Sequence, residues 1–273
     1  MPSTGHRAAA STALRSALGA GDRCGRVLGV FPSAVYAELG DELIALETSD
    51  ALRLPCAVVL PVPAAARPFA GLQAGDPVTA KGALLTVGGR TAVVARWWRP
   101  RRPRTTGAYD VAQLSTIAAT LPPLTPLVTD RLAGLVRRLQ THGDVRHETR
   151  GLLGLGDGLT PEGDDALAGL LVALRARAAD GPTADRLADA VRELAPSRTT
   201  TVSAALLRHA SEGHAIPRLL DVIDALGAPS GDELTTAVVR LLAVGHTSGT
   251  ALAHGALAAA RLQTTTRARS EVA

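Results

Sequence analysis

Aromatic residues, lysine, cysteine and long apolar runs are all scarce in this chain of 273 residues. It contains two Phe, two Trp and two Tyr, so its core must be built mainly from Ala, Leu and Val. Cys24 and Cys56 are too few for a disulfide framework and lack the spacing of metal ligands, and we interpret both as reduced thiols of the core. No apolar run approaches the roughly 18 residues of a membrane-spanning helix, and the N-terminus lacks the apolar segment of a signal peptide. We therefore expect a cytoplasmic protein with no membrane partner.

The positive charge of the chain is nearly all arginine, because Lys81 is the only lysine. The formal net charge is +4, and the one basic cluster is residues 96–104, Arg-Trp-Trp-Arg-Pro-Arg-Arg-Pro-Arg. Arginine beside tryptophan could hold phosphates and stack on nucleic-acid bases. The alternative is a solvated linker whose two tryptophans pack on a neighbouring domain, and we favour it because a single short basic run is weak evidence. Nucleic-acid binding is thus the last of the functions that we consider.

The N-terminal part of the sequence, residues 1–104, is typical of a β-rich module. Short, partly alternating apolar stretches are separated by Gly and Pro, which predicts several short strands in a small barrel or sandwich. His6 is expected in a mobile N-terminal segment. The Gly88-Gly89 pair resembles a hairpin connection. Strands are expected within residues 25–36, 43–46, 56–62, 77–85 and 90–98.

Residues 105–273 show helical patterns instead. The fold class is therefore α+β, with an N-terminal β-rich barrel or sandwich module followed by a helical module. Thr125 precedes Pro126 as a capping residue precedes a proline at the first helical position, and a helix is expected over residues 127–140. Apolar residues at helical spacing predict further helices at residues 184–194, 200–210, 216–226, 234–243 and 248–262.

The stretch Gly154-Leu-Gly-Asp-Gly-Leu-Thr-Pro-Glu-Gly-Asp-Asp165 is the most informative of the chain. Glycines at alternate positions allow backbone conformations that side chains forbid, and they let a ligand approach closely. Thr160 is expected to cap a helix whose first residue is Pro161, and the free amides at such a helix start attract anions. Small and apolar residues follow on nearly every side of this helix, so we expect it to be buried.

Asp164 and Asp165 lie at the start of that helix, where an unpaired buried carboxylate would be costly. The two aspartates could merely complement the helix dipole or pair with arginines. They could instead hold Mg²⁺ that in turn binds phosphate. As a third interpretation, they could exchange protons with a substrate or hydrogen-bond its amino groups. The loop lacks the Gly-Lys-Ser/Thr ending of a P-loop, which excludes an ordinary nucleoside triphosphatase.

Two later helix starts are also rich in hydroxyl groups. Arg198-Thr-Thr-Thr-Val-Ser203 combines one arginine with several hydroxyls, and Gly245-His-Thr-Ser-Gly249 adds His246, which could act as acid or base or donate to an oxyanion. Each motif alone could be simple capping, but three in one helical module predict a shared cleft. The other histidines, His209 and His214 among them, show no ligand spacing. The predicted ligand-binding residues are Gly154, Gly156, Gly158, Thr160, Gly163, Arg198, Thr199, Thr200, Ser203, Thr247, Ser248 and Gly249, and the catalytic candidates are Asp164, Asp165 and His246.

In this order, the three motifs resemble those of the AllH-type subunit of oxamate carbamoyltransferase. The resemblance extends over most of the chain, with a variable β-rich front. It implies a part in purine and allantoin nitrogen breakdown, in which oxalurate and phosphate are converted to oxamate and carbamoyl phosphate. It also implies partner subunits. Asp157 and Glu162 stand where many relatives are expected to have Pro and Ser, and Ala251 stands where Asp is frequent; these departures bear on the substrate rather than on the fold.

Two functions are weighed on this basis. The chain could be a carbamoyltransferase-like enzyme subunit that binds a small anionic metabolite between the glycine loop and the two later helix starts. Helix amides, Arg198 and His246 would then hold the phosphate and polarise the carbonyl group. Alternatively, it could be a non-catalytic ligand-binding or assembly subunit of a multi-subunit complex. In either case Mg²⁺ is the cofactor that Asp164 and Asp165 could hold.

Overall fold

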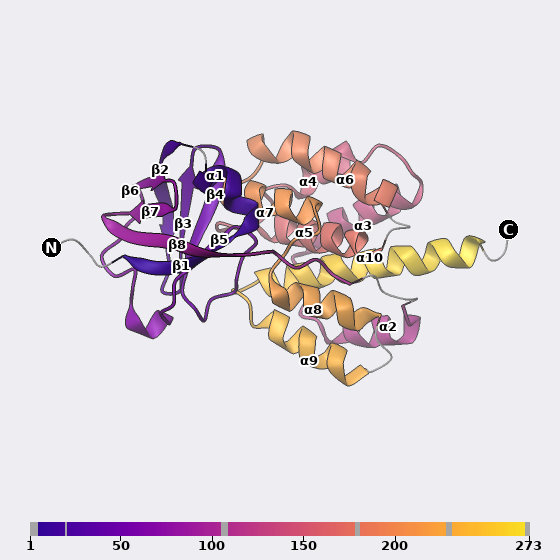
Figure 1. Ribbon diagram of the computed structural model, residues 1–273. Coiled ribbons are helices and arrows are strands. Elements are labelled where there is room, and N and C mark those ends of the chain that lie inside the picture. The colour runs from indigo at the N-terminus through magenta and orange to yellow at the C-terminus, as the bar shows by residue number, and fades with distance from the viewer. Residues whose placement is uncertain (1–4, 20, 105–108, 178–180, 228–230, 271–273) are drawn as a thin grey trace. The chain divides into compact units, whose positions relative to one another are not determined.

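The computed structural model describes residues 5–19, 21–104, 109–177, 181–227 and 231–270, with the backbone alone at residues 231 and 263–270. The chain divides into two compact units, residues 1–100 and 101–273. The first unit is built of strands and the second of helices (Figure 1). The predicted α+β class, with a β module followed by a helical module, is confirmed.

The first unit is a closed barrel with the strand order β1-β5-β4-β3-β2-β6-β7-β8. Most neighbouring strands are antiparallel, but β4 and β5 are parallel, and so are β1 and β8, whose pairing closes the barrel. Gly88 and Gly89 connect β7 to β8 with φ angles of +52° and +80°, as in the two-residue hairpin turn that was predicted. The strands are β1 (His6–Ser11), β2 (Asp22–Val30), β3 (Ala34–Leu39), β4 (Glu42–Glu47), β5 (Ala57–Val59), β6 (Pro77–Lys81), β7 (Leu84–Val87) and β8 (Arg90–Trp98).

Two expectations for the barrel are wrong. His6 does not lie in a mobile segment, because it begins β1, which pairs with both β5 and β8. This strand gave little signal because three of its six residues are alanine, which is not enriched in strands. Cys24 is exposed on β2, so Cys56 alone belongs to the core.

The second unit is organised around α5 (Glu162–Arg175). Of its 14 residues, all but Ala168 and Arg175 are buried, as the sequence predicted. A helix that is buried on every side has no face left for solvent, so its polar residues must find partners inside the protein. The helices that contact α5 are α3 (Pro126–Gln140), α4 (Arg146–Leu152), α6 (Gly181–Leu194), α7 (Thr201–Ser211), α8 (Pro217–Leu226) and α10 (Ser248–Ser270).

The remaining helices are α2 (Val111–Thr120) and α9 (Gly231–Leu242), besides the short α1 (Arg15–Gly19) in the first unit. Neither α2 nor α4 was predicted. With seven residues, α4 is too short to show a helical period. No helix in the described ranges is long and apolar enough to cross a membrane.

Helices α5 and α10 lie side by side with almost no space between their backbones (Figure 1). A Cβ atom on Gly169 of α5 would lie 2.1 Å from the carbonyl oxygen of Leu252, and one on Gly255 of α10 would lie 2.0 Å from the carbonyl oxygen of Ala166. Each helix therefore presents a glycine to the backbone of the other, and no larger residue fits at either position without a shift.

Candidate functional site

The glycine loop before α5 depends on its glycines mainly for its own folding. Gly154, Gly156 and Gly158 have φ angles of +74°, +118° and +90°, which disfavour any other residue. A Cβ atom on Gly154 would lie 2.3 Å from the carbonyl oxygen of Arg198, and one on Gly156 would lie 2.7 Å from the amide nitrogen of Glu162. Gly158 faces open space. Of the three glycines, Gly158 is thus the one beside which a ligand has room.

The start of α5 differs from the prediction at Thr160. The N-cap residue is Pro161, whose φ and ψ of −53° and 146° are extended, and the first helical residue is Glu162. Because the helix begins one residue later than expected, Thr160 is not the cap. Its hydroxyl instead lies 3.1 Å from the hydroxyl of Ser248, the first residue of α10. Gly163 is also structural, since a Cβ atom there would lie 2.2 Å from the carbonyl oxygen of Leu152.

Asp164 ties the glycine loop to the second motif. Its Oδ1 accepts a hydrogen bond of 2.9 Å from the amide of Gly154, and its Oδ2 accepts a short one from the hydroxyl of Thr199. Burial raises the pKa of Asp164 above its usual value, while the hydrogen bonds from Thr199, Gly154 and Ser203 lower it. Both carboxylate oxygens are used within the chain. The contacts are those of a side chain that positions two segments.

Asp165 ties the same helical turn to the third motif. Burial raises its pKa from 3.8 to about 7, against the hydroxyls of Ser248 and Thr160, which hydrogen-bond the carboxylate and lower the pKa. The residue is 8% exposed, and its Oδ2 has no hydrogen-bond partner among the described residues. A buried carboxyl group with a pKa near neutrality can hold or release a proton at physiological pH. Asp165 therefore keeps one carboxylate oxygen without a hydrogen-bond partner, and Asp164 does not.

Glu162 accounts for part of the acidity of this loop. Its Oε2 accepts a hydrogen bond of 2.7 Å from the hydroxyl of Thr125, whose amide lies 3.3 Å from both carboxylate oxygens. Thr125 is the N-cap residue of α3, yet its own hydroxyl makes no capping bond. Glu162 thus satisfies the start of α3 in its place. Glu162 stands where a serine was expected in many relatives, and its bonds to Thr125 give this difference a structural reason.

The second motif caps α7 with Thr200. The hydroxyl oxygen of Thr200 accepts a hydrogen bond of 3.0 Å from the amide of Ser203, and the hydroxyl donates to the carbonyl oxygen of Leu159 in the glycine loop. One residue earlier, Thr199 reaches Asp164. The second motif is therefore joined to the first by two hydrogen bonds, one from Thr199 and one from Thr200.

The structure brings the starts of α5, α7 and α10 together. Asp165 contacts Ser248, and one turn further along both helices Gly169 contacts Leu252, so α5 and α10 run parallel and begin side by side. Thr199 holds the start of α7 against the same turn of α5. Each helix start carries a partial positive charge, which the buried carboxylates of α5 offset.

Two side chains next to these contacts remain open to solvent. Arg198 directly precedes Thr199, and His246 lies two residues before Ser248; both are exposed, as is Thr247. Neither the guanidinium of Arg198 nor the ring of His246 forms a hydrogen bond or an ion pair with any described residue. Gly249 has a packing role, since a Cβ atom there would lie 2.0 Å from the carbonyl oxygen of Leu241. Of the predicted residues, Arg198, His246, Thr247 and Gly158 are exposed to solvent, whereas Asp165 is buried.

The acidic residues of α5 do not form a complete cation site. A cage for Mg²⁺ requires several oxygen ligands around one point. Within the described ranges, Glu162, Asp164 and Asp165 do not gather as three ligand atoms, whereas His209, Glu212 and His214 do. Magnesium at the aspartate pair would thus need oxygens from the ligand itself, and it remains a prediction.

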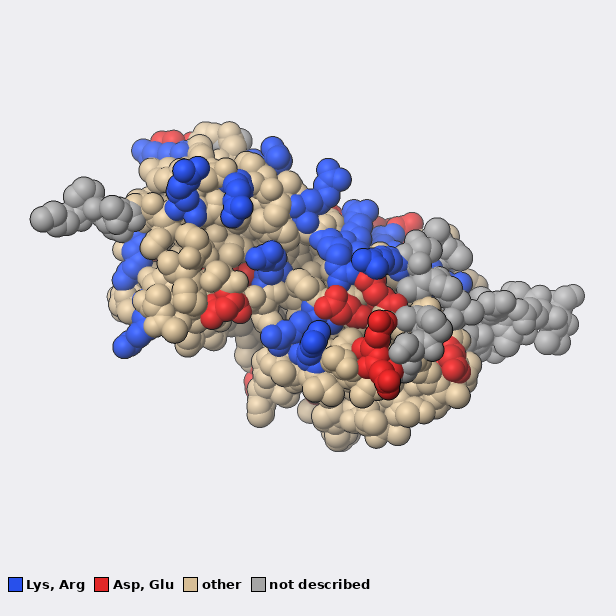
Figure 2. All heavy atoms as spheres, turned by 60° about the horizontal axis from the view of Figure 1, so that its bottom comes forward, with Lys and Arg blue, Asp and Glu red and all other residues tan. Residues whose placement is uncertain are grey.

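Part of the basic run at residues 96–104 is engaged within each unit. Arg101 forms ion pairs with Asp221 and Asp224 of α8. In the barrel, the guanidinium groups of Arg15 and Arg53 lie over the rings of Trp97 and Trp98, so these tryptophans pack on their own unit. On the face shown in Figure 2, acidic and basic side chains of the helical unit adjoin each other. This arrangement does not favour phosphate binding by the run.

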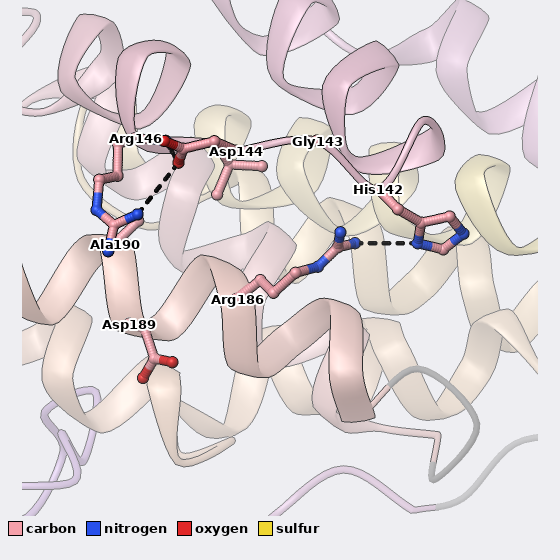
Figure 3. Close-up of a pocket in the computed structure, with 8 residues that line it drawn as sticks. His142, Gly143, Asp144, Arg146, Arg186, Asp189 and Ala190 are labelled. Carbon is pink, nitrogen blue, oxygen red and sulfur yellow. Dashed lines mark hydrogen bonds and ion pairs between the residues drawn. The ribbon is translucent and has the colours of Figure 1, made fainter.

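A cavity of about 360 Å³ lies elsewhere in the helical unit, between the turn after α3 and helix α6 (Figure 3). None of the predicted site residues lines it. Its charged groups are partly matched, because Arg146 pairs with Asp144 and Glu193, and Arg186 contacts the ring nitrogen of His142 at 3.3 Å. With as many acidic as basic residues in its wall, it favours neither an anion nor a cation.

The comparison with known protein families matches the part of the chain that contains α5, α7 and the start of α10. Residues 152–260 match the family model described as oxamate carbamoyltransferase subunit AllH. The AllH resemblance is confirmed. The AllH region, residues 152–260, contains all three motifs and runs from the end of α4 into α10. It is narrower than the sequence suggested, since the match does not reach the barrel. No curated protein and no solved structure matched the chain.

Proposed function

We propose that the chain is a subunit of an oxamate carbamoyltransferase-type enzyme and binds a small anionic metabolite where the three motifs meet. The observation that carries this proposal is the pair Asp164 and Asp165. These adjacent side chains fasten the second and third motifs to one turn of α5. As a result, the exposed side chains of Arg198 and His246 are held beside the same turn.

The proposed chemistry assigns a role to each of these groups. In the reaction implied by the family, a phosphate oxygen attacks the carbamoyl carbon of oxalurate, the carbon–nitrogen bond breaks, and the departing nitrogen takes a proton to give oxamate. Arg198 would hold the phosphate, because a guanidinium binds such oxygens in a bidentate manner. Asp165 or His246 would supply the proton to the departing nitrogen, as a general acid does. Asp164 would keep Arg198 in place through Thr199.

Calorimetric titration of the purified chain with carbamoyl phosphate tests the proposal, with and without Mg²⁺. Replacing Arg198 with Ala removes a charge-assisted contact and should weaken binding by about tenfold or more. Arg137→Ala removes another exposed arginine, at the end of α3, and should leave the affinity unchanged. Equal affinity of both variants and the unmodified chain would contradict the site, and a dependence on Mg²⁺ would show that the ligand completes the metal shell.

A second function, a non-catalytic binding or assembly subunit, is favoured by one observation. Several predicted residues of the motifs, among them Asp164, Gly154 and Gly249, are occupied by contacts within the chain. A chain whose motif residues mainly stabilise its own fold could bind and position partner subunits that carry out the chemistry. Turnover of oxalurate and phosphate only after a partner subunit is added would support this alternative. We further propose a role in purine and allantoin catabolism, which rests on the family resemblance, and a cytoplasmic location, which rests on the composition of the sequence.

A further inference from the structure

The C-terminal end of α7 brings two histidines together. The helix ends at Ser211, and Gly213 adopts a left-handed conformation with a φ of +80°. The amide of Gly213 donates to the carbonyl of Ala210, and the amide of His214 donates to the carbonyl of His209, both at 2.9 Å. This pair of hydrogen bonds defines a Schellman motif, in which the third-last helical residue and the second residue after the cap touch. Here these two positions are His209 and His214.

Between them, Glu212 supplies a carboxylate. One ligand atom from each of His209, Glu212 and His214 lies within 4.8 Å of the other two. His209 is 6% exposed, and its Nε2 is buried without a hydrogen-bond partner among the described residues. The Nδ1 of His214 is likewise buried without a hydrogen bond, 3.5 Å from Glu212 Oε2. Two neighbouring buried nitrogens without hydrogen-bond partners are unusual in a folded protein and require an explanation.

We propose that His209, Glu212 and His214 form a binding site for a divalent transition metal ion of the zinc class. Two imidazole nitrogens and one carboxylate oxygen are ligands that zinc accepts, and three protein ligands leave a fourth position for water or another group. The negative end of the α7 dipole lies at the same place and favours a cation. The site is separate from the three motifs and does not depend on the proposed function.

Arg102 opposes metal binding and thereby provides a test. Its Nε donates a hydrogen bond of 3.2 Å to His214 Nε2, which places the ring proton of a neutral imidazole on Nδ1. A metal ion at Nδ1 would require that proton to leave this nitrogen, and Nε2 would then carry the proton and lose the bond from Arg102. Removal of the arginine also removes a positive charge beside the cation. Arg102→Ala should therefore bind the metal more tightly than the unmodified chain.

The experiment is a titration of the tag-free, chelator-treated chain with Zn²⁺ by calorimetry, and with Co²⁺ by its visible absorption. We expect one ion per chain. His214→Ala and Glu212→Gln should weaken binding by at least about tenfold, the lower limit seen even for residues that only orient metal ligands. His147→Ala removes an exposed histidine of α4 and should have no effect. Circular dichroism checks that each variant is folded, and Glu212→Gln changes no side-chain volume at an exposed position.

The outcomes separate the proposal from adventitious binding. Loss of affinity in His214→Ala and Glu212→Gln, together with a gain in Arg102→Ala, supports the site. Absence of Zn²⁺ binding to the unmodified chain would overturn it. Affinity that falls equally in His147→Ala and His214→Ala would also overturn it, because the ion would then be held by surface histidines in general.

Discussion

The replacement of Asp165 by Asn tests how the buried turn of α5 is held together. At low pH the protonated carboxyl group and the amide are nearly equal in size and hydrogen-bonding capacity, so the variant keeps its contacts with Ser248 and Thr160. At high pH Asp165 must ionise in a site where burial disfavours the charge. The variant never carries that charge. Asp165→Asn should therefore be more stable than the unmodified chain at high pH and about equally stable at low pH.

The size of the effect follows from the pKa of Asp165, which rises from 3.8 to about 7 on folding. Below pH 4 both the folded and the unfolded chain hold this proton, and it contributes nothing. Between about pH 4 and pH 7 the unfolded chain releases the proton while the folded chain keeps it, so the stability of the unmodified chain falls as the pH rises. Above pH 7 both states are ionised and the loss is constant. A shift of about three pKa units corresponds to about 4 kcal/mol.

Urea unfolding followed by circular dichroism at pH 5 and pH 8 measures this difference. Other buried groups titrate in the same range, and His209, whose pKa is lowered, acts in the opposite direction. For this reason the informative quantity is the free energy of unfolding of the variant minus that of the unmodified chain. This difference should increase by a few kcal/mol between pH 5 and pH 8. A difference that is the same at both values would refute the buried, high-pKa description of Asp165.

Three further perturbations test the packing and charge of the two units. Thr199→Val removes the hydroxyl that donates to Asp164 and should destabilise the helical unit by about 1–3 kcal/mol in urea, because a buried carboxylate oxygen loses its partner; no change would show that this bond is dispensable. Gly169→Ala should destabilise the helical unit by about 1–3 kcal/mol, because the added methyl group overpacks against Leu252. Gly181→Ala places its methyl group in open space and should have no such effect, so equal losses of stability would contradict the close crossing of α5 and α10. Glu47 of the barrel is 1% exposed, and burial raises its pKa to about 7. The barrel should therefore lose stability as the pH rises from about 4.5 to 7, and Glu47→Gln should reduce this loss. Fluorescence of Trp97 and Trp98 reports this last transition, and an unchanged pH dependence would contradict it.

The fold class could be predicted because its signals are local. Glycines at the hairpin before β8 and the proline at the start of α3 act through the backbone conformation of single residues. The closure of the barrel could not be predicted, since it depends on the parallel pairing of β1 with β8. These strands are far apart in the sequence, and β1 offers mostly alanine to the pattern. Long-range pairing of weakly patterned strands leaves no trace in a single sequence.

The candidate site could likewise be predicted from the sequence only in part. Hydroxyl-rich helix starts are visible in the sequence, and their order suggested that they belong together. The hydrogen-bond partners were not visible: Thr160 contacts Ser248 of α10 and the side chain of Asp165 instead of capping α5, and Glu162 bonds the start of α3 from 37 residues away. The pair His209 and His214 was overlooked because its spacing resembles no metal motif. The signal was Gly213, which follows a helical stretch directly and marks the turn that brings the two rings together.

The different contacts of the two aspartates determine which variants can distinguish enzyme from assembly subunit. Asp164 accepts hydrogen bonds from the glycine loop and from the start of α7, so its replacement disturbs both segments whatever the protein does. Loss of activity in an Asp164 variant would therefore be expected under either function. The side chains of Arg198 and His246 are exposed and form no hydrogen bond or ion pair with a described residue, so their replacement should leave the packing intact. If the assembled enzyme loses turnover in these two variants while the chain keeps its stability, the chemistry belongs to this subunit; if turnover persists, the chain serves a partner that carries it out.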